Sequence, residues 1–115
     1  MADDRYEDGV VRVVQWVAGM PTTVGLGLLV GRREVVTCAH VVNAALSRPL
    51  RSAEPPSEEK RVTVEFPFLG GRLTRQGRVA AWLPPPAEGL GPDVAGLTLG
   101  EDAPTGASAA RFASS

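Results

Sequence analysis

The chain has 115 residues, of which 43% are hydrophobic and 22% are charged, and its formal net charge at pH 7 is −1. This length fits one domain, and this composition is typical of a globular protein. The near-neutral charge, without a basic face, disfavours nucleic acid and anionic lipid as partners, and every apolar run is too short to span a membrane.

The N-terminal stretch MADDRYEDG is acidic and lacks the basic and apolar regions of a secretory signal, so we expect a cytoplasmic protein. Residues 1–8 are expected to be flexible. Cys38 is the only cysteine, which excludes an internal disulfide and agrees with a reducing compartment.

Short runs of β-branched and apolar residues, bounded by glycine, proline and charged turns, predict six strands, at residues 10–17, 23–30, 34–38, 61–67, 73–84 and 93–99. The first run is expected to end at Ala18-Gly19 and Pro21. The link Gly31-Arg32-Arg33 is short enough for a hairpin. Alternation is clearest in the fourth run, in which Val62, Val64 and Phe66 share one face. The fifth run is expected to bend at Gly77.

The segments between these strands differ in character. Residues 41–46 contain good helix formers and can hold one or two helical turns. Residues 47–60 and 84–92 are polar or rich in proline and are expected to be surface loops. Residues 101–115 are small and polar and are predicted to form a flexible tail.

Six short strands without a long helix predict an all-β fold, either a sandwich or a barrel. A closed, six-stranded antiparallel barrel over residues 9–100 is favoured, because closure removes the exposed strand edges.

Two strand ends carry residues with catalytic chemistry. His40, the only histidine, follows the third strand in VVTCAH, and Asp93 opens the sixth in GPDVAGL. In an antiparallel barrel these two positions can lie at the same rim. An imidazole that acts as a general base needs a carboxylate on its far nitrogen, to fix the tautomer and stabilise the imidazolium.

The stretch TVGLGLLVGRREVVTCAHVV resembles the bacterial trypsin-like serine peptidases, in which a G-x-G strand leads through a hairpin to a T-[AC]-A-H turn with the catalytic histidine. GPDVAGLTL is similar to the strand of that family that carries the catalytic aspartate. The resemblance covers residues 9–100 and implies the first of the family's two barrels. It also implies that His40 is the general base and Asp93 its orienting partner, with a protein or peptide as substrate and no cofactor.

The family's second barrel supplies the nucleophilic serine and the oxyanion hole on a G-[DN]-S-G-G turn, and this chain contains no such turn. We therefore expect the N-terminal half of a serine endopeptidase, inert alone and completed by a second barrel from the same natural chain or a partner chain. The alternative is a non-catalytic β-barrel module that binds a partner protein.

Simpler interpretations of the same residues are also open. His40 can be a structural histidine at a turn, and Asp93 a turn residue after Pro92. Cys38 is expected to be a small buried thiol rather than a nucleophile. No metal site is expected at Cys38 and His40, because the chain has no other histidine or cysteine to complete it.

Overall fold

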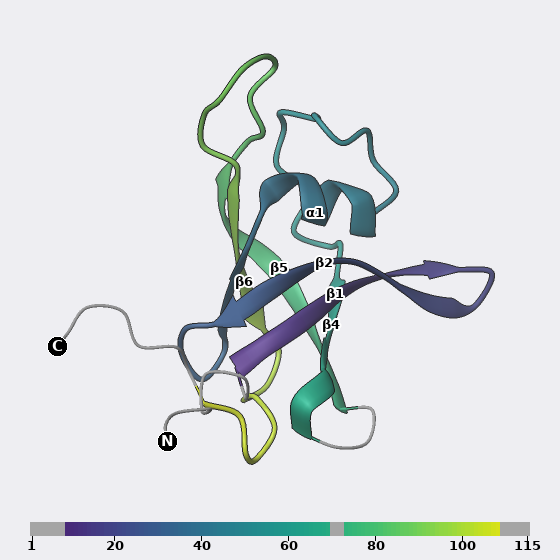
Figure 1. The fold of residues 1–115 in the computed structure, drawn as a ribbon, viewed down its shortest axis with the longest axis vertical. Coiled ribbons are helices and arrows are strands. Elements are labelled where there is room, and N and C mark those ends of the chain that lie inside the picture. Colours follow the sequence, from purple (N-terminus) through teal and green to yellow (C-terminus); the bar gives the residue numbers. More distant parts are fainter. Residues whose placement is uncertain (1–8, 70–72, 109–115) are drawn as a thin grey trace, which may run out of the picture.

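The computed structural model describes residues 9–69 and 73–108, and in this part of the chain six strands form a closed antiparallel barrel in the order β1-β2-β3-β6-β5-β4 (Figure 1). The strands are β1 (Val10–Val17), β2 (Met20–Leu29), β3 (Glu34–Thr37), β4 (Val62–Phe66), β5 (Leu73–Leu83) and β6 (Val94–Leu99). The predicted six-stranded all-β barrel is confirmed. The predicted flexible residues 1–8, and residues 109–115 of the predicted tail, lie outside the described residues.

The turn between β1 and β2 is tighter than the sequence suggests. Ala18 and Gly19 have positive φ angles of 52° and 80°, as in the two-residue turns that suit the twist of a hairpin. As a result β2 begins at Met20 rather than at residue 23, and Pro21 lies opposite Trp16. Strand β3 pairs only with Leu28 and Leu29, so the first part of β2 has no partner strand on that side. The missing N–H of Pro21 therefore removes no hydrogen bond between β2 and β3.

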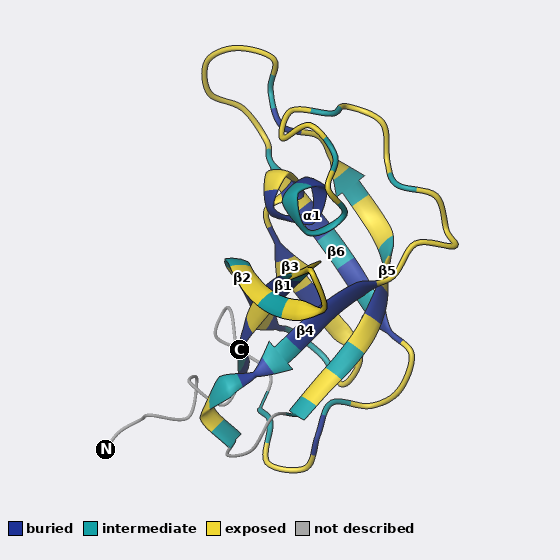
Figure 2. Cartoon of the chain, turned by 90° about the vertical axis from the view of Figure 1, so that its right-hand side faces the viewer, coloured by how far each residue is buried: buried dark blue, intermediate teal, exposed yellow. Residues whose placement is uncertain are grey.

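The core consists mainly of side chains that point inward from the strands, together with Val41 and Val42, and Figure 2 shows the buried stretches of the strands in dark blue. In β4 the expected alternation is confirmed, since Val62, Val64 and Phe66 are all buried. The outward Thr63 is also covered, because its hydroxyl oxygen accepts hydrogen bonds from Trp16 Nε1 at 3.2 Å and Gln76 Nε2 at 2.7 Å.

Strand β5 changes partner at Gly77, which pairs with Val62 of β4 on one side and Leu99 of β6 on the other. A Cβ atom at this position would lie 3.2 Å from Leu99 Cδ2, so the absence of a side chain permits close packing. The register shift in β5 lies between Val79 and Ala81, beyond Gly77.

One α-helix is described, α1 (Ala39–Ala45), and a single 3-10 turn, η2 (Pro67–Leu69), follows β4. The helix begins two residues before the predicted helical turns and therefore includes His40. Figure 1 shows α1 and the loops 47–60 and 84–92 together at one end of the barrel. No helix in the described residues has the length and apolar character needed to cross a membrane.

Residues 101–108, which the sequence places in a flexible tail, contact the opposite end of the barrel. Asp102 accepts a 2.8 Å hydrogen bond from Arg33 Nε, and its backbone oxygen accepts another at 2.8 Å from Arg75 Nε. The N–H of Ala103 donates to the carbonyl oxygen of Arg32 at 2.8 Å. Pro104 is buried.

Candidate active site

The end of β3 fixes the position of His40. Thr37, the last residue of β3, donates its hydroxyl to the carbonyl oxygen of Leu26 at 2.8 Å. Helix α1 starts two residues later, and its inner face is anchored by the fully buried Ala39 and Val42. His40 lies on the other face of the helix, with 46% of its side chain exposed. The imidazole is thus accessible while its backbone is held.

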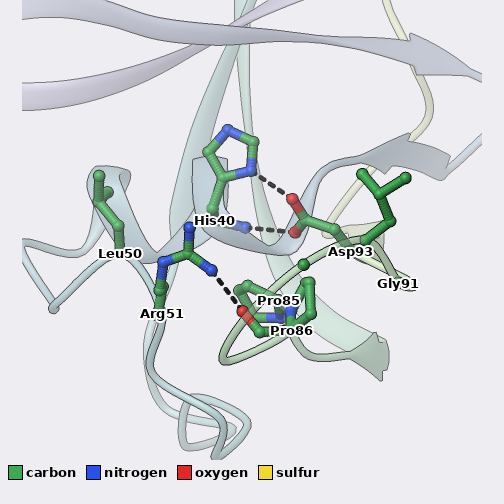
Figure 3. Close-up of a pocket in the computed structure, with 9 residues that line it drawn as sticks. His40, Leu50, Arg51, Pro85, Pro86, Gly91 and Asp93 are labelled. Carbon is green, nitrogen blue, oxygen red and sulfur yellow. Dashed lines mark hydrogen bonds and ion pairs between the residues drawn. The ribbon is translucent and has the colours of Figure 1, made fainter.

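Asp93 reaches His40 because β3 and β6 are neighbours in the barrel. Thr37 pairs with Ala95, which brings the end of β3 and the start of β6 to the same rim. His40 Nδ1 lies 2.5 Å from Asp93 Oδ2, and the backbone N–H of His40 donates to Oδ1 at 2.9 Å. Figure 3 shows the carboxylate facing the ring and the backbone of His40. The predicted meeting of these two side chains at one rim is therefore confirmed.

The environment of Asp93 favours its ionised form. Partial burial by itself raises the pKa of the carboxyl, but the hydrogen bonds from the His40 ring and backbone, with a further one from the Ala39 backbone, lower the pKa below its usual value. A carboxylate at this position holds the proton on Nδ1 of a neutral imidazole, which leaves Nε2 as the basic nitrogen. Figure 3 shows Nε2 on the side of the ring away from Asp93.

A pocket of about 370 Å³ lies beside this pair, between the loops 47–60 and 84–92 (Figure 3). Its walls are mainly apolar, with Arg51 as a nearby cation. The lining residues are His40, Leu50, Arg51, Pro85, Pro86, Gly89, Leu90, Gly91 and Asp93. The pocket has the size and mixed lining of a site for a side chain or small ligand.

Side chains that the sequence analysis did not identify hold the walls of this pocket. Arg51 Nη1 donates to the carbonyl oxygens of Pro86 and Ala87 at 2.5 and 3.3 Å and so joins the two loops. The fully buried Asn43 donates from Nδ2 to Leu50 O at 2.9 Å and Ser52 O at 3.2 Å. In the sequence, the only sign of a role for Asn43 is that it is a polar residue inside an apolar helical stretch. Nothing in the sequence pattern points to Arg51.

Trp82 adds a third attachment for the loop 47–60. Its indole N–H donates to the carbonyl oxygen of Ala53 at 2.8 Å, and the guanidinium of Arg48 lies 5.8 Å from its ring centroid. The Trp82 side chain is half-buried in this position.

Cys38 differs from its prediction, because it is exposed rather than buried. It lies between the last residue of β3 and the first residue of α1, and its side chain is on the outer side of the barrel at this junction. Partial desolvation of its sulfur raises the pKa of the thiol, and the negative charge of Asp93 raises it further. Such a thiol is a weak nucleophile at neutral pH.

Cys38 also lies beside the other two residues of this rim. One ligand atom from each of Cys38, His40 and Asp93 is within 4.8 Å of the other two. The chain has no further histidine or cysteine for a metal site, but the carboxylate of Asp93 supplies a third ligand beside Cys38 and His40.

No family model matches the chain, and the search of curated proteins gave no match.

Proposed function

We propose that this chain is the N-terminal barrel of a trypsin-like serine endopeptidase, in which His40 is the general base and Asp93 orients it. The observation that carries the proposal is the double contact between Asp93 and His40, one bond to the ring at 2.5 Å and one to the backbone at 2.9 Å. In the complete enzyme Nε2 of His40 takes the serine proton as the hydroxyl attacks the peptide carbonyl, and later gives it to the leaving amine.

The proposed reaction needs two groups that this sequence does not contain, a serine on a G-[DN]-S-G-G turn and the donors of an oxyanion hole. A second barrel supplies both in the proposal. It has to lie next to the exposed side of the His40 ring.

A row of exposed apolar side chains supports such a neighbour. On the outer face of the barrel, Leu28 of β2 pairs with Val36 of β3, and Leu83 of β5 pairs with Val94 of β6. Together with Leu26, these exposed residues form what we call the apolar patch: Leu26, Leu28, Val36, Leu83 and Val94. Val94 directly follows Asp93, so the patch extends to the catalytic rim. Contiguous exposed apolar surface of this kind is typical of an interface.

The pocket beside His40 fits the proposed substrate, a protein or peptide. An apolar wall formed by Leu50, Pro85 and Leu90 suits the side chain of a residue close to the scissile bond.

The test is to express the natural reading frame beyond codon 115, alone or with neighbouring genes, and to treat the product with a fluorophosphonate probe. The proposal predicts labelling of a serine on a Gly-x-Ser-Gly turn. His40→Ala should decrease the labelling rate by about 10⁴-fold or more, as expected for loss of a triad base. The matched control Asp102→Asn changes an exposed carboxylate at the opposite end of the barrel, keeps the ring and Asp93, and should label. A reading frame and neighbouring genes without a second barrel would refute the proposal.

A non-catalytic module that binds a partner protein is the second candidate, and the apolar patch favours it as well. The two candidate functions differ in whether His40 at the rim is required. A binding module that uses the patch keeps its affinity for the partner after His40→Ala and loses it after Val36→Lys. A peptidase loses its activity in both variants.

A further inference from the structure

The rim holds three side chains with different metal-binding atoms. Cys38 offers a sulfur, His40 a ring nitrogen and Asp93 a carboxylate oxygen, and these atoms lie within 4.8 Å of one another. The strand pairing that ends at Thr37 and Ala95 fixes the backbones on which they stand. The three side chains therefore share one location set by the sheet.

The spacing of the three atoms is close to that of a zinc site. Zinc–ligand bonds of about 2.0 to 2.3 Å in a tetrahedron put the ligand atoms roughly 3.3 to 3.8 Å apart. His40 Nδ1 and Asp93 Oδ2, at 2.5 Å, have to separate slightly, and the sulfur of Cys38 lies within 4.8 Å of a ligand atom of each. All three side chains are at least partly exposed and can make these rotations without displacing the core.

The donor set also selects the class of ion. Thiolate sulfur and imidazole nitrogen favour Zn²⁺ and related late transition metals, whereas Mg²⁺ and Ca²⁺ require oxygen ligands. A thiolate and a carboxylate together neutralise the two positive charges of the ion. Three protein ligands leave one tetrahedral position for water.

We propose that Cys38, His40 and Asp93 form a binding site for Zn²⁺ at the rim of the barrel, with Nδ1 as the His40 ligand. The Cys38 thiol loses its proton to solvent when its sulfur binds the ion. The imidazole stays neutral because its proton moves from Nδ1 to Nε2.

This site does not depend on the proposed peptidase function, since it requires only residues of the described chain. Its consequence for that function is direct. The ion replaces the proton between His40 and Asp93, so a barrel with bound zinc cannot present Nε2 as a free base.

The experiment is a titration of the purified, reduced chain with Co²⁺, followed by displacement with Zn²⁺. We expect one ion per chain and a thiolate-to-cobalt charge-transfer band in the near-ultraviolet, which Zn²⁺ removes. Cys38→Ser should abolish the band and weaken Zn²⁺ binding by at least about tenfold, and Asp93→Asn should weaken it by about tenfold. The matched control is Asp102→Asn, which removes an exposed carboxylate at the opposite end and should leave the affinity unchanged.

Circular dichroism of each variant checks that the barrel is folded. A wild-type chain that binds Co²⁺ without the sulfur band, or that binds no metal, would overturn the proposal. Unchanged Zn²⁺ affinity in folded Cys38→Ser would overturn it too. Neither result bears on labelling by the fluorophosphonate probe, so the two proposals fail separately.

Discussion

The contact between His40 and Asp93 depends on both oxygens of one carboxylate. Oδ2 faces the ring and Oδ1 accepts the backbone N–H of His40, so the ring and its backbone are oriented by the same group. Neither bond requires any residue outside this barrel, and the pair is therefore preformed. In the proposed peptidase, this preformed orientation would hold the base ready before the substrate arrives.

Replacing Asp93 with asparagine tests this orientation. The Nδ1 proton of His40, hydrogen-bonded to a carboxylate, should give a proton NMR signal far downfield, and Asp93→Asn should remove it. In the proposed complete enzyme the same change should reduce kcat by about 10⁴-fold, because the tautomer is no longer fixed. Asp102→Asn should leave the signal in place. A downfield signal that persists in Asp93→Asn would show that the contact does not hold this proton.

Asn43 supports the site from beneath, through the carbonyl groups of Leu50 and Ser52. Asn43→Ala should reduce the free energy of unfolding by about 1 to 3 kcal/mol, because both carbonyls lose a donor at a buried position. Urea denaturation measures this change. Ser57→Ala, an exposed position in the same loop, is the control and should have almost no effect. Equal stability of both variants would contradict the supporting role of Asn43.

At the level of elements, α1 lies on β2 with very little space between them. A Cβ atom at Gly25 would lie 2.5 and 2.7 Å from the two methyl carbons of Val41, which is closer than real contacts allow. Gly25 therefore determines how closely the helix that carries His40 approaches the barrel.

Gly25→Ala should consequently push α1 outward. We expect a loss of about 1 to 3 kcal/mol in the free energy of unfolding, typical of an overpacked contact, together with shifted NMR resonances for His40. Gly100→Ala is the matched control, since the nearest atom to its Cβ is 3.7 Å away. Equal urea midpoints for Gly25→Ala and Gly100→Ala would show that Gly25 is not needed for the close packing of α1 on β2.

The segment 101–108 depends on ionised Asp102 for one of its attachments. The hydrogen bond from Arg33 lowers the pKa of Asp102, slight desolvation opposes this, and the positive charges of Arg33 and Arg32 lower the pKa further. Because the folded-state pKa is the lower one, this attachment is complete above the unfolded value of about 4 and is lost as the pH falls through the folded value. Hydrogen-exchange protection factors of the Ala103 amide should therefore fall below about pH 4, and Asp102→Asn should remove that dependence. A protection factor independent of pH in the wild-type chain would contradict this.

The elements of this fold were predictable where local patterns determine them. The alternation in β4 and the short link before β3 follow from local patterns, whereas the meeting of His40 with Asp93 followed from the expected barrel, in which both strand ends share a rim. The exposure of Cys38 was not predicted, because its neighbours in VVTCAH are apolar, although the alternation of β3, with Val35 and Thr37 buried, places residue 38 on the outer face. The contacts of Asn43 and Arg51 join distant segments and leave no local pattern to recognise.

At the scale of the molecule, the described residues form a barrel with a buried interior and with the apolar patch on its outer face. The patch crosses four adjacent strands, β2, β3, β6 and β5, and lies next to the rim. Water contact with these side chains is unfavourable, and association removes it. We therefore expect the chain to self-associate when no partner is present.

Val36, near the middle of the apolar patch, is the position to test. Val36→Lys should weaken self-association by about tenfold or more, because an interface would have to bury the new charge. Sedimentation velocity over a range of concentrations measures the effect. Phe68→Lys changes an exposed apolar residue beyond the other end of β5 and should sediment like the wild type. A wild-type chain that stays monomeric at all concentrations would contradict the expectation.

The way the barrel closes has a consequence for the order of folding. Neighbouring hairpins can form early, but Arg12 meets Glu65 across 53 residues of chain, and His40 meets Asp93 across another 53. Pairings at this separation have a large loop-closure entropy, which slows folding and delays them relative to local contacts. The imidazole of His40 and the carboxylate of Asp93 thus come together only when the barrel closes. The downfield proton signal of His40 would then report the last step of refolding, because it should appear after the hairpins have formed and not together with them.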